Sequence, residues 1–271
     1  MLVVGCSGTS ALASFLDFHN KICFIHITKC AGTAFTVGYQ RAISHDRLLI
    51  CESPRPSLLN SFTTLAWRLR SKSPLPLVTL PSFHNTKSSF RHVRDSFTSL
   101  AGVYGTHIPL SLLVGLIAQA DNTDIDRIRE EWKFITIVRE PSERLISFLN
   151  YAKSFKYHHL YPLLKDVTTT GDALKIFNAS SYEMPMAEYF SLIPIESLNL
   201  TVYEQANLPH EFCFESANDT LRFKIPTITH RKDGESRSLI LFDNIPPQEL
   251  LSMSPWHSDK EFFETIKHLI P

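Results

Sequence analysis

The sequence lacks most of the features that assign a protein to a class at sight. Its 271 residues include 27 basic and 27 acidic side chains, so no overall charge favours nucleic acid as a partner. Its five cysteines are odd in number and show no C-x-x-C spacing, which argues against a zinc site and a dense disulfide framework. With 44% hydrophobic residues, the chain can still bury a sizeable core, and we expect one α/β domain.

Membrane and secretion signals are also weak. Residues 1–20 are mildly apolar, but Gly, Ser, Thr and Asp interrupt them and no basic start precedes them, so they resemble neither a membrane span nor a good signal peptide. We treat them as a segment of uncertain order ahead of a domain at 21–271. Membrane association would then need an anchor outside this chain. Asn178, Asn199 and Asn218 each open an N-x-[ST] triplet, which matters only in a secretory lumen.

Acidic residues are absent from Ser53 to Arg94, whereas seven basic residues occur there. Prolines and serines break the periodicity across about 51–95, which indicates an insertion or long loop. One interpretation is a solvated surface excursion. The other is a rim of cations, including Arg91 and Arg94, that receives an anionic substrate.

The most informative stretch runs from Lys21 to Phe35 and predicts a strand, a loop and a helix. An apolar, β-branched and aromatic run ends at Thr28, small residues with Lys29 and Gly32 follow, and helical spacing then continues over 34–50. The free N–H groups of a helix start favour an anion. Lys29 adds a positive charge, Gly32 would let a ligand approach, and Thr33 could donate a hydrogen bond and cap the helix.

This loop does not match the nucleotide loop G-x-x-x-x-G-K-[ST], because its lysine precedes the glycine and the earlier glycine is missing. An ordinary ATP-dependent kinase is therefore disfavoured. A plain structural turn fits the residues as well as a phosphate-binding loop does.

A second unit repeats the plan. The run KFITIV at Lys133 to Val138 predicts a buried strand, and Pro141 then opens a helix. Arg139 at the strand tip and Ser147 on the helix suit a phosphate dianion. We interpret Glu143 and Arg144 as surface charges at the helix start.

Further elements are predicted less sharply. A short strand after Leu100 leads to His107 and a helix opened by Pro109, so His107 would lie at the rim of the sheet, where a structural role is also common. A polar surface helix or turn should follow. Beyond the second unit we expect the segments that follow here in chain order: a helix at Ser181–Ile193, a strand at Leu198–Tyr203, a basic loop at Ile228–Leu241 and one or two helices at Gln248–Leu269.

Together, the motifs FIHITKCAGTAF and FITIVREPSERLISF resemble those of the carbohydrate sulfotransferases, specifically the membrane-bound branch with the uronyl and heparan sulfate 2-O-sulfotransferases. The resemblance implies a single P-loop-like α/β domain with a mainly parallel central sheet. It also implies 3′-phosphoadenosine 5′-phosphosulfate (PAPS) as sulfate donor, no metal, a carbohydrate or glycan acceptor that could be anionic, and no nucleic acid.

Site residues follow from the same resemblance. The loop that binds the 5′-phosphosulfate would contain Lys29, Ala31, Gly32, Thr33 and Ala34, with Lys29 also catalytic. Arg139 and Ser147 would bind the 3′-phosphate. His107, in Thr106-His107-Ile108, would be the catalytic base. A loop over the nucleotide would supply Arg231 and Lys232. Arg91 and Arg94, as candidates for the acceptor side, come from the basic window at Ser53 to Arg94 and not from the resemblance.

The sequence departs from that family at three loop positions, where Thr28, Cys30 and Ala34 replace a proline and two hydroxyl residues. A catalytically weak or inactive PAPS-binding paralogue that serves as a partner protein is therefore the alternative function, and a small-molecule kinase is a more distant one. The resemblance implies the Golgi lumen, whereas the missing anchor and signal leave the cytoplasm as the alternative. The oligomeric state stays open.

Overall fold

The computed structural model describes residues 14–43, 48–50, 107–155, 158–179, 184–215, 220–226 and 245–270. They contain two sheets, whose strands are β1 (Phe15–Asp17), β2 (Ile22–Ile25), β3 (Leu48–Ile50), β4 (Lys133–Val138), β5 (Leu200–Glu204), β6 (Glu211–Glu215) and β7 (Thr220–Lys224). The larger sheet has the order β3-β1-β2-β4-β5, and β6 and β7 form a separate antiparallel hairpin.

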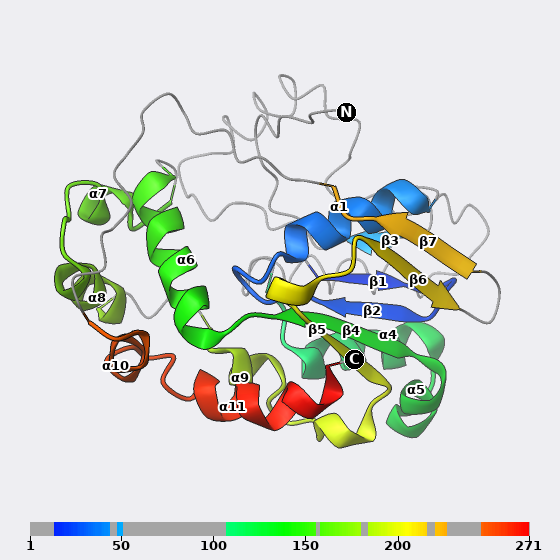
Figure 1. Cartoon of the computed structure of the whole chain (residues 1–271). Coiled ribbons are helices and arrows are strands. Elements are labelled where there is room, and N and C mark those ends of the chain that lie inside the picture. Colours follow the sequence, from blue (N-terminus) through cyan, green and yellow to red (C-terminus); the bar gives the residue numbers. More distant parts are fainter. Residues whose placement is uncertain are drawn as a thin grey trace, which may run out of the picture.

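Helices surround the larger sheet (Figure 1). The α-helices are α1 (Gly32–Ala42), α4 (Leu110–Asp121), α5 (Ile125–Glu131), α6 (Pro141–Ser154), α7 (Tyr161–Leu164), α8 (Thr170–Asn178), α9 (Met186–Tyr189), α10 (Pro247–Ser252) and α11 (Asp259–Ile266). Three short 3-10 helices are η1 (Ile195–Ser197), η2 (Gln205–Asn207) and η3 (Lys267–Leu269). None of the helices in the described ranges has the length and apolarity that a membrane crossing requires.

The expected α/β class is confirmed. β2, β4 and β5 run parallel, whereas β1 pairs antiparallel with both β2 and β3. The parallel arrangement therefore covers the centre and one edge of the sheet. In Figure 1, α1 and the β6-β7 hairpin lie on one side of the sheet, and α4, α5 and α11 lie on the other.

Several predicted elements are confirmed near their expected bounds. β2, β4, β5, α4, α6 and the C-terminal helices all form, and α5 occupies the polar segment where a surface helix or turn was expected. At the start of α6, Pro141 takes the first helical position, and the Glu140 carboxylate accepts the backbone N–H of Glu143 at 2.8 Å. Both features suit a helix start, because proline needs no N–H there and an acidic cap satisfies a free donor.

Two predicted helices are wrong in extent. The helix expected over 34–50 ends at Ala42, and Leu48–Ile50 pairs as a strand with β1, so tertiary pairing overrides the helical spacing. The helix expected over 181–193 is reduced, within the described residues, to Met186–Tyr189. Pro185 disfavours helix before it, and the left-handed backbone of Leu192 (φ 74°) prevents continuation after it.

The short strand β1 and the β6-β7 hairpin were not predicted. All three residues of β1 are buried, and Asp17 closes the following turn by accepting the backbone N–H groups of His19 and Asn20, both at 3.0 Å. β6 and β7 each alternate exposed and buried side chains, a pattern typical of a sheet with one face on the core.

The main core is an aromatic cluster between the sheet, α1 and the hairpin. Phe35 on α1 lies 4.5 Å from Phe24, 5.1 Å from Phe212 and 5.3 Å from Phe223, measured between ring centroids. Stacked and edge-to-face pairs of this kind add to the stabilisation from burial. Phe35 thus joins the large sheet to the hairpin. A second cluster surrounds Trp256 and joins α6, α7, α8 and α10.

We predict that Phe35→Ala lowers the free energy of unfolding by roughly 3–5 kcal/mol, because it leaves a cavity between the rings of Phe24, Phe212 and Phe223. Leu163→Ala is the control, since Leu163 is 60% exposed and should change stability by no more than about 0.5 kcal/mol. Urea unfolding followed by circular dichroism measures both. Equal losses in the two variants would contradict the role given to Phe35.

Candidate functional site

The two loops singled out in the sequence lie at the same edge of the sheet. β2 and β4 are parallel neighbours, with Ile25 opposite Thr136, so their carboxyl ends face the same way. From β2 the chain passes through α1 to β3 on one side, and from β4 it passes through α6 to β5 on the other. The direction of winding therefore reverses between β2 and β4, which is where open α/β sheets bind ligands.

The loop between β2 and α1 has an unusual backbone. Lys29 (φ 65°) and Ala31 (φ 64°) are both left-handed, although neither is glycine. Such conformations cost on the order of 1–3 kcal/mol each and gather at ligand sites. Ala31 is the N-cap residue without a side-chain cap, so Thr33 does not cap the helix as expected. No carbonyl among the described residues accepts the backbone N–H of Gly32 or Thr33.

Gly32 is required by a contact within the protein. A Cβ atom at this position would lie 2.0 Å from Cδ2 and 2.5 Å from Nε2 of His26, too close for any side chain. The imidazole of His26, which is 5% exposed, therefore fills the space beside Gly32 through which a ligand was expected to approach. The glycine lets the helix start pack directly on a buried histidine.

His107 lies against this loop. Its Nδ1 atom is 3.2 Å from the carbonyl oxygen of His26, and the two imidazole centroids are 5.0 Å apart. Because a carbonyl only accepts hydrogen bonds, the proton belongs on Nδ1 in the neutral ring, which leaves the lone pair on Nε2. In that tautomer, Nε2 is the ring nitrogen that could accept a proton. Tyr189 lies beside it and shares a 3.0 Å hydrogen bond between hydroxyls with Thr28.

One face of α6 follows the loop. Arg144, Ser147 and Tyr151 are spaced three and four residues apart, so they lie on the same side of the helix. At one end Arg144 donates from Nε to the Thr28 carbonyl at 3.0 Å, and at the other the Lys29 ammonium lies 4.0 Å above the Tyr151 ring. Half-buried Ser147 sits between these contacts. The structure therefore brings Lys29 and Ser147 to one helix face.

Arg139 also lies at this edge of the sheet, but its side chain is paired with Glu143. It follows the tip of β4 as predicted, and its Nε is 3.3 Å from the carboxylate of Glu143 one turn into α6. The Arg139 side chain is 25% exposed and that of Glu143 is 53% exposed, so the ion pair is a weak surface contact. A phosphate could take over this guanidinium at little cost.

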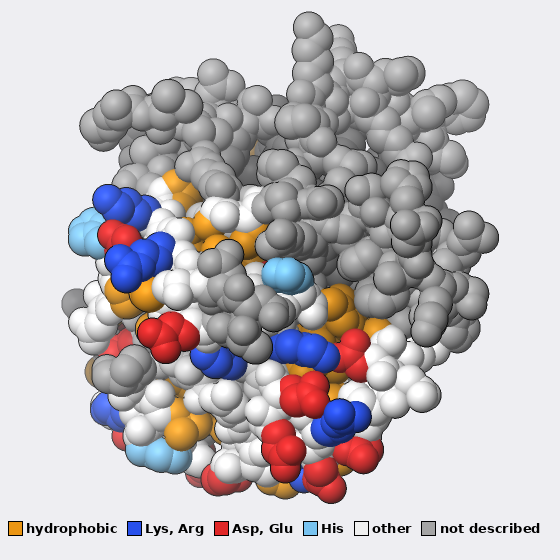
Figure 2. Space-filling view, turned by 90° about the vertical axis from the view of Figure 1, so that its right-hand side faces the viewer, with side chains coloured by type: hydrophobic (Ala, Val, Ile, Leu, Met, Phe, Trp, Pro, Cys, Tyr) orange, Lys and Arg blue, Asp and Glu red, His pale blue; other side chains and the backbone are white. Residues whose placement is uncertain are grey.

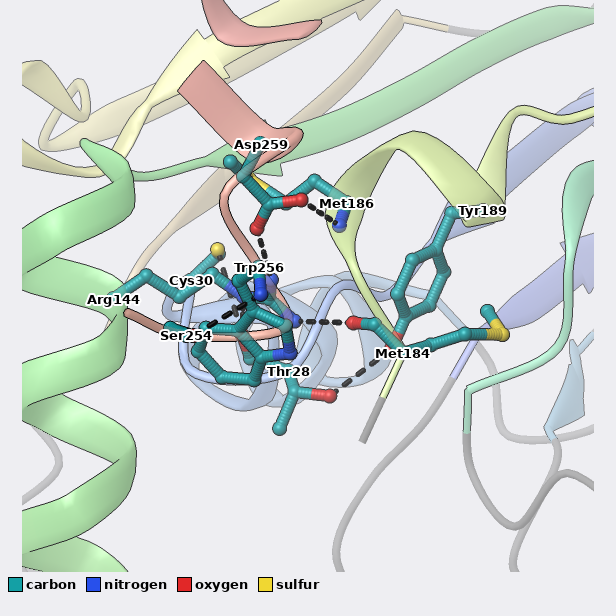
Figure 3. Close-up of polar contacts among 9 residues, drawn as sticks. All are labelled: Thr28, Cys30, Arg144, Met184, Met186, Tyr189, Ser254, Trp256 and Asp259. Atoms are coloured by element: carbon teal, nitrogen blue, oxygen red, sulfur yellow. Dashed lines mark hydrogen bonds and ion pairs between the residues drawn. The ribbon is translucent and has the colours of Figure 1, made fainter. Parts of the chain in front are cut away.

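The prediction that Arg144 is a surface charge is wrong. Its side chain is fully buried and donates to Asp259 at 2.6 Å, to the Met184 carbonyl at 2.8 Å and to the Thr28 carbonyl. Figure 3 shows these bonds converging on the guanidinium, which also lies 3.8 Å from the centre of the Trp256 ring. The sequence pattern placed Arg144 correctly near the start of a helix. It could not predict that segments distant in sequence cover this helix start.

The buried surroundings of Arg144 shift the pKa values of two neighbouring residues, Asp259 and Cys30. Burial raises the pKa of Asp259, while the Arg144 guanidinium and the backbone N–H of Met186, at 2.6 Å, oppose that rise. Burial also raises the pKa of Cys30 to about 12, and its Sγ points to the Thr28 carbonyl at 3.5 Å. Cys30 is thus an inert part of the interior.

Beside Lys29, His158 occupies an apolar setting at the end of α6. Its ring packs edge-on against Phe148 and Tyr151, and its Nδ1 accepts the backbone N–H of Leu160 at 3.1 Å. Burial, followed by the nearby charges of His159 and Lys29, lowers the pKa of His158 to about 4. His158 is therefore neutral at physiological pH.

The remaining candidates lie outside the described residues, namely Arg91, Arg94, Arg231, Lys232 and the insertion expected at about 51–95. In the part of the chain that is described, no three His, Cys, Asp or Glu side chains gather as metal ligands would.

Figure 2 shows basic and acidic side chains interspersed on one face. Such mixing agrees with the ion pairs on α5 between Arg127 and Glu131 and between Arg129 and Asp126.

No protein-family model, curated protein or solved structure matches this chain.

We predict that Arg144→Met lowers the free energy of unfolding by roughly 3–5 kcal/mol, because it leaves the Asp259 carboxylate buried without its partner. Arg144→Met combined with Asp259→Leu should cost less than the sum of the single changes. The control is Lys175→Met, which breaks an exposed pair with Asp172 and should cost at most about 1 kcal/mol. Denaturant unfolding measures all four, and additive losses would argue against the coupling.

A pH titration tests the setting of His158. The pKa of His158 in the folded chain, about 4, lies below the usual value of about 6.5. Between pH 6.5 and pH 4, His158 is therefore protonated in the unfolded chain but not in the folded chain. Folding stability should fall as pH drops through this window, and His158→Gln should flatten the fall. NMR should show the imidazole titrating near pH 4. A midpoint near the usual value of about 6.5 would refute the burial argument.

Proposed function

We propose that the protein binds PAPS at the junction of β2, α1 and α6 and transfers its sulfuryl group to a hydroxyl of a carbohydrate acceptor. The observation that carries the proposal is the meeting of both phosphate-type motifs at the switch point between β2 and β4, with His107 bonded to the first loop. Sequence resemblance suggested the motifs, and their spatial agreement is an independent reason to take them together.

The residues of the loop fit a phosphate or sulfate group in charge and in donors. Lys29 supplies a cation and Ser147 a hydroxyl. The backbone N–H groups of Gly32 and Thr33 are at the start of α1 and donate to no carbonyl among the described residues, as an anion-binding helix start requires. Arg139 supplies a second cation through a pair that an anion can displace. The left-handed residues Lys29 and Ala31 set these donors in a tight concave turn.

In the proposed reaction each residue has a definite task. PAPS, when bound, supplies an activated sulfuryl group. Lys29 offsets the negative charge on the departing phosphate, and His107 Nε2 accepts the proton of the attacking hydroxyl. The bond from His107 Nδ1 to the His26 carbonyl keeps the ring in the required tautomer and orientation. Arg144 contributes by holding the Thr28 carbonyl, and thus the loop, in place.

A second candidate function is a catalytically inactive PAPS-binding protein. It is favoured by the side chains that replace hydroxyl donors in the loop, because Cys30 is fully buried and turned inward and Ala34 has no polar group. Thr28 engages Tyr189 instead of facing outward. Loss of a charge-assisted bond costs about 1.5–3 kcal/mol, so binding could persist with weak transfer.

The first experiment measures binding of 3′-phosphoadenosine 5′-phosphate (PAP), the product of PAPS, by calorimetry. We expect PAP to bind more tightly than ATP with magnesium, and Lys29→Gln to weaken PAP binding about ten- to a hundredfold, as loss of one charge-assisted bond implies. Lys175→Gln removes an equal charge from exposed α8 and should leave affinity unchanged. Absence of PAP binding to the unmodified chain would rule out both candidate functions.

The second experiment separates the two candidates by incubating the chain with labelled PAPS and a panel of glycans. We expect transfer to at least one glycan, its loss in His107→Ala, and nearly unchanged PAP affinity in that variant. His210→Ala is the control, because His210 is exposed in the connection before β6. PAP binding without transfer to any acceptor would favour the inactive protein, and transfer by His107→Ala would remove His107 as the base.

A further inference from the structure

We propose that Asn199 is a modification site that carries an N-linked oligosaccharide whenever the chain enters the secretory lumen. The triplet Asn199-Leu200-Thr201 is an acceptor sequence, and in the structure it is presented at the surface. The proposal concerns a different edge of the protein from the candidate PAPS site and does not depend on that site.

The local geometry exposes the acceptor side chain. Asn199 lies immediately before β5 and is exposed, and within the described ranges its carboxamide makes no hydrogen bond. Leu200 donates its backbone N–H to the Leu198 carbonyl at 2.8 Å, which closes a tight turn centred on Asn199. Such a turn is common where a strand begins, and here the apolar side chains on either side of Asn199 pack against the core.

Asn178, the other acceptor asparagine in a described segment, is held differently. Its amide nitrogen donates to the Met253 carbonyl at 2.7 Å, which ties the end of α8 to the residue after α10. A sugar on that nitrogen would have to share the space with Met253. The two asparagines are both exposed, so the difference between them is the partner of the amide and not access to solvent.

The position of Asn199 is compatible with activity. β5 is parallel to β4, so the start of β5 lies at the edge of the sheet opposite the loops that follow β2 and β4. A bulky glycan there would stay clear of Lys29 and His107. β5 is also the last strand of the sheet, and edge strands invite pairing with other chains. A glycan at its start would hinder such pairing.

The chemistry of attachment is a group transfer from a lipid-linked oligosaccharide diphosphate. Nδ2 of Asn199 forms a bond to the anomeric carbon of the first sugar. The bond from that carbon to the lipid diphosphate breaks, the diphosphate leaves with the electron pair, and the amide nitrogen loses one proton. The Thr201 hydroxyl completes the acceptor sequence.

The test is expression of the full chain with a cleavable secretion leader in eukaryotic cells. The secreted protein is treated with a peptide N-glycosidase, an amidase that hydrolyses the glycosylated side-chain amide and so converts that asparagine into aspartate, and peptide masses then report each site. We expect most of the peptide with Asn199 to carry the conversion. Thr201→Ala should abolish it although Asn199 is still present, and Thr201→Ser, which keeps the acceptor sequence, should retain it.

Asn178→Gln is the matched control and should leave modification of Asn199 unchanged. An unmodified Asn199 in the secreted chain, or conversion that persists in Thr201→Ala, would overturn the proposal. PAP binding is measured on the same samples. A chain that binds PAP without a glycan at Asn199 would refute this inference alone, and a glycosylated chain that fails to bind PAP would refute the proposed function alone.

Discussion

The buried ion pair between Arg144 and Asp259 is the interaction on which the arrangement of the candidate site depends. A guanidinium removed from water must have nearly all its donors satisfied, and here they reach Asp259, the Met184 carbonyl and the Thr28 carbonyl. These partners belong to three segments that lie far apart in the sequence. The same charge therefore positions the β2-α1 loop, the segment before α9 and the start of α11 with respect to α6.

The site itself combines two kinds of constraint. Strand pairing brings the ends of β2 and β4 together, which any parallel sheet would do. The tight packing of His26 on Gly32 and the left-handed residues Lys29 and Ala31 are particular to this loop. They define the backbone of this turn, and its own side chains Cys30 and Thr28 are buried in the protein. A site of this kind relies on backbone groups and on neighbours from α6 more than on the side chains of the loop.

Much of the fold was predictable because apolar runs and prolines in the sequence mark the elements locally. The apolar run Lys133–Val138 and the proline at position 141 were enough for β4 and α6. The β6-β7 hairpin could also have been found, since both strands alternate clearly. By contrast, β1 has only three residues, too few for a periodic signal, and the end of α1 is decided by pairing of β3 with β1. Among the candidate site residues, Lys29, His107 and Ser147 were predicted from motifs. Arg144 was missed because charge on a helix start usually means exposure, and its burial depends on segments far along the chain.

The separation of Arg144 from Asp259, 115 residues in sequence, also bears on how the protein is made. Synthesis runs from the N-terminus, so the arginine leaves the ribosome long before its carboxylate partner. Until Asp259 arrives, desolvating the guanidinium would be costly, and the nascent β2-α1 loop has no fixed anchor on its Thr28 carbonyl. The β2-β4 core can collapse early by hydrophobic burial. We therefore expect the loop to reach its final shape only as α11 docks, late in the biogenesis of the protein.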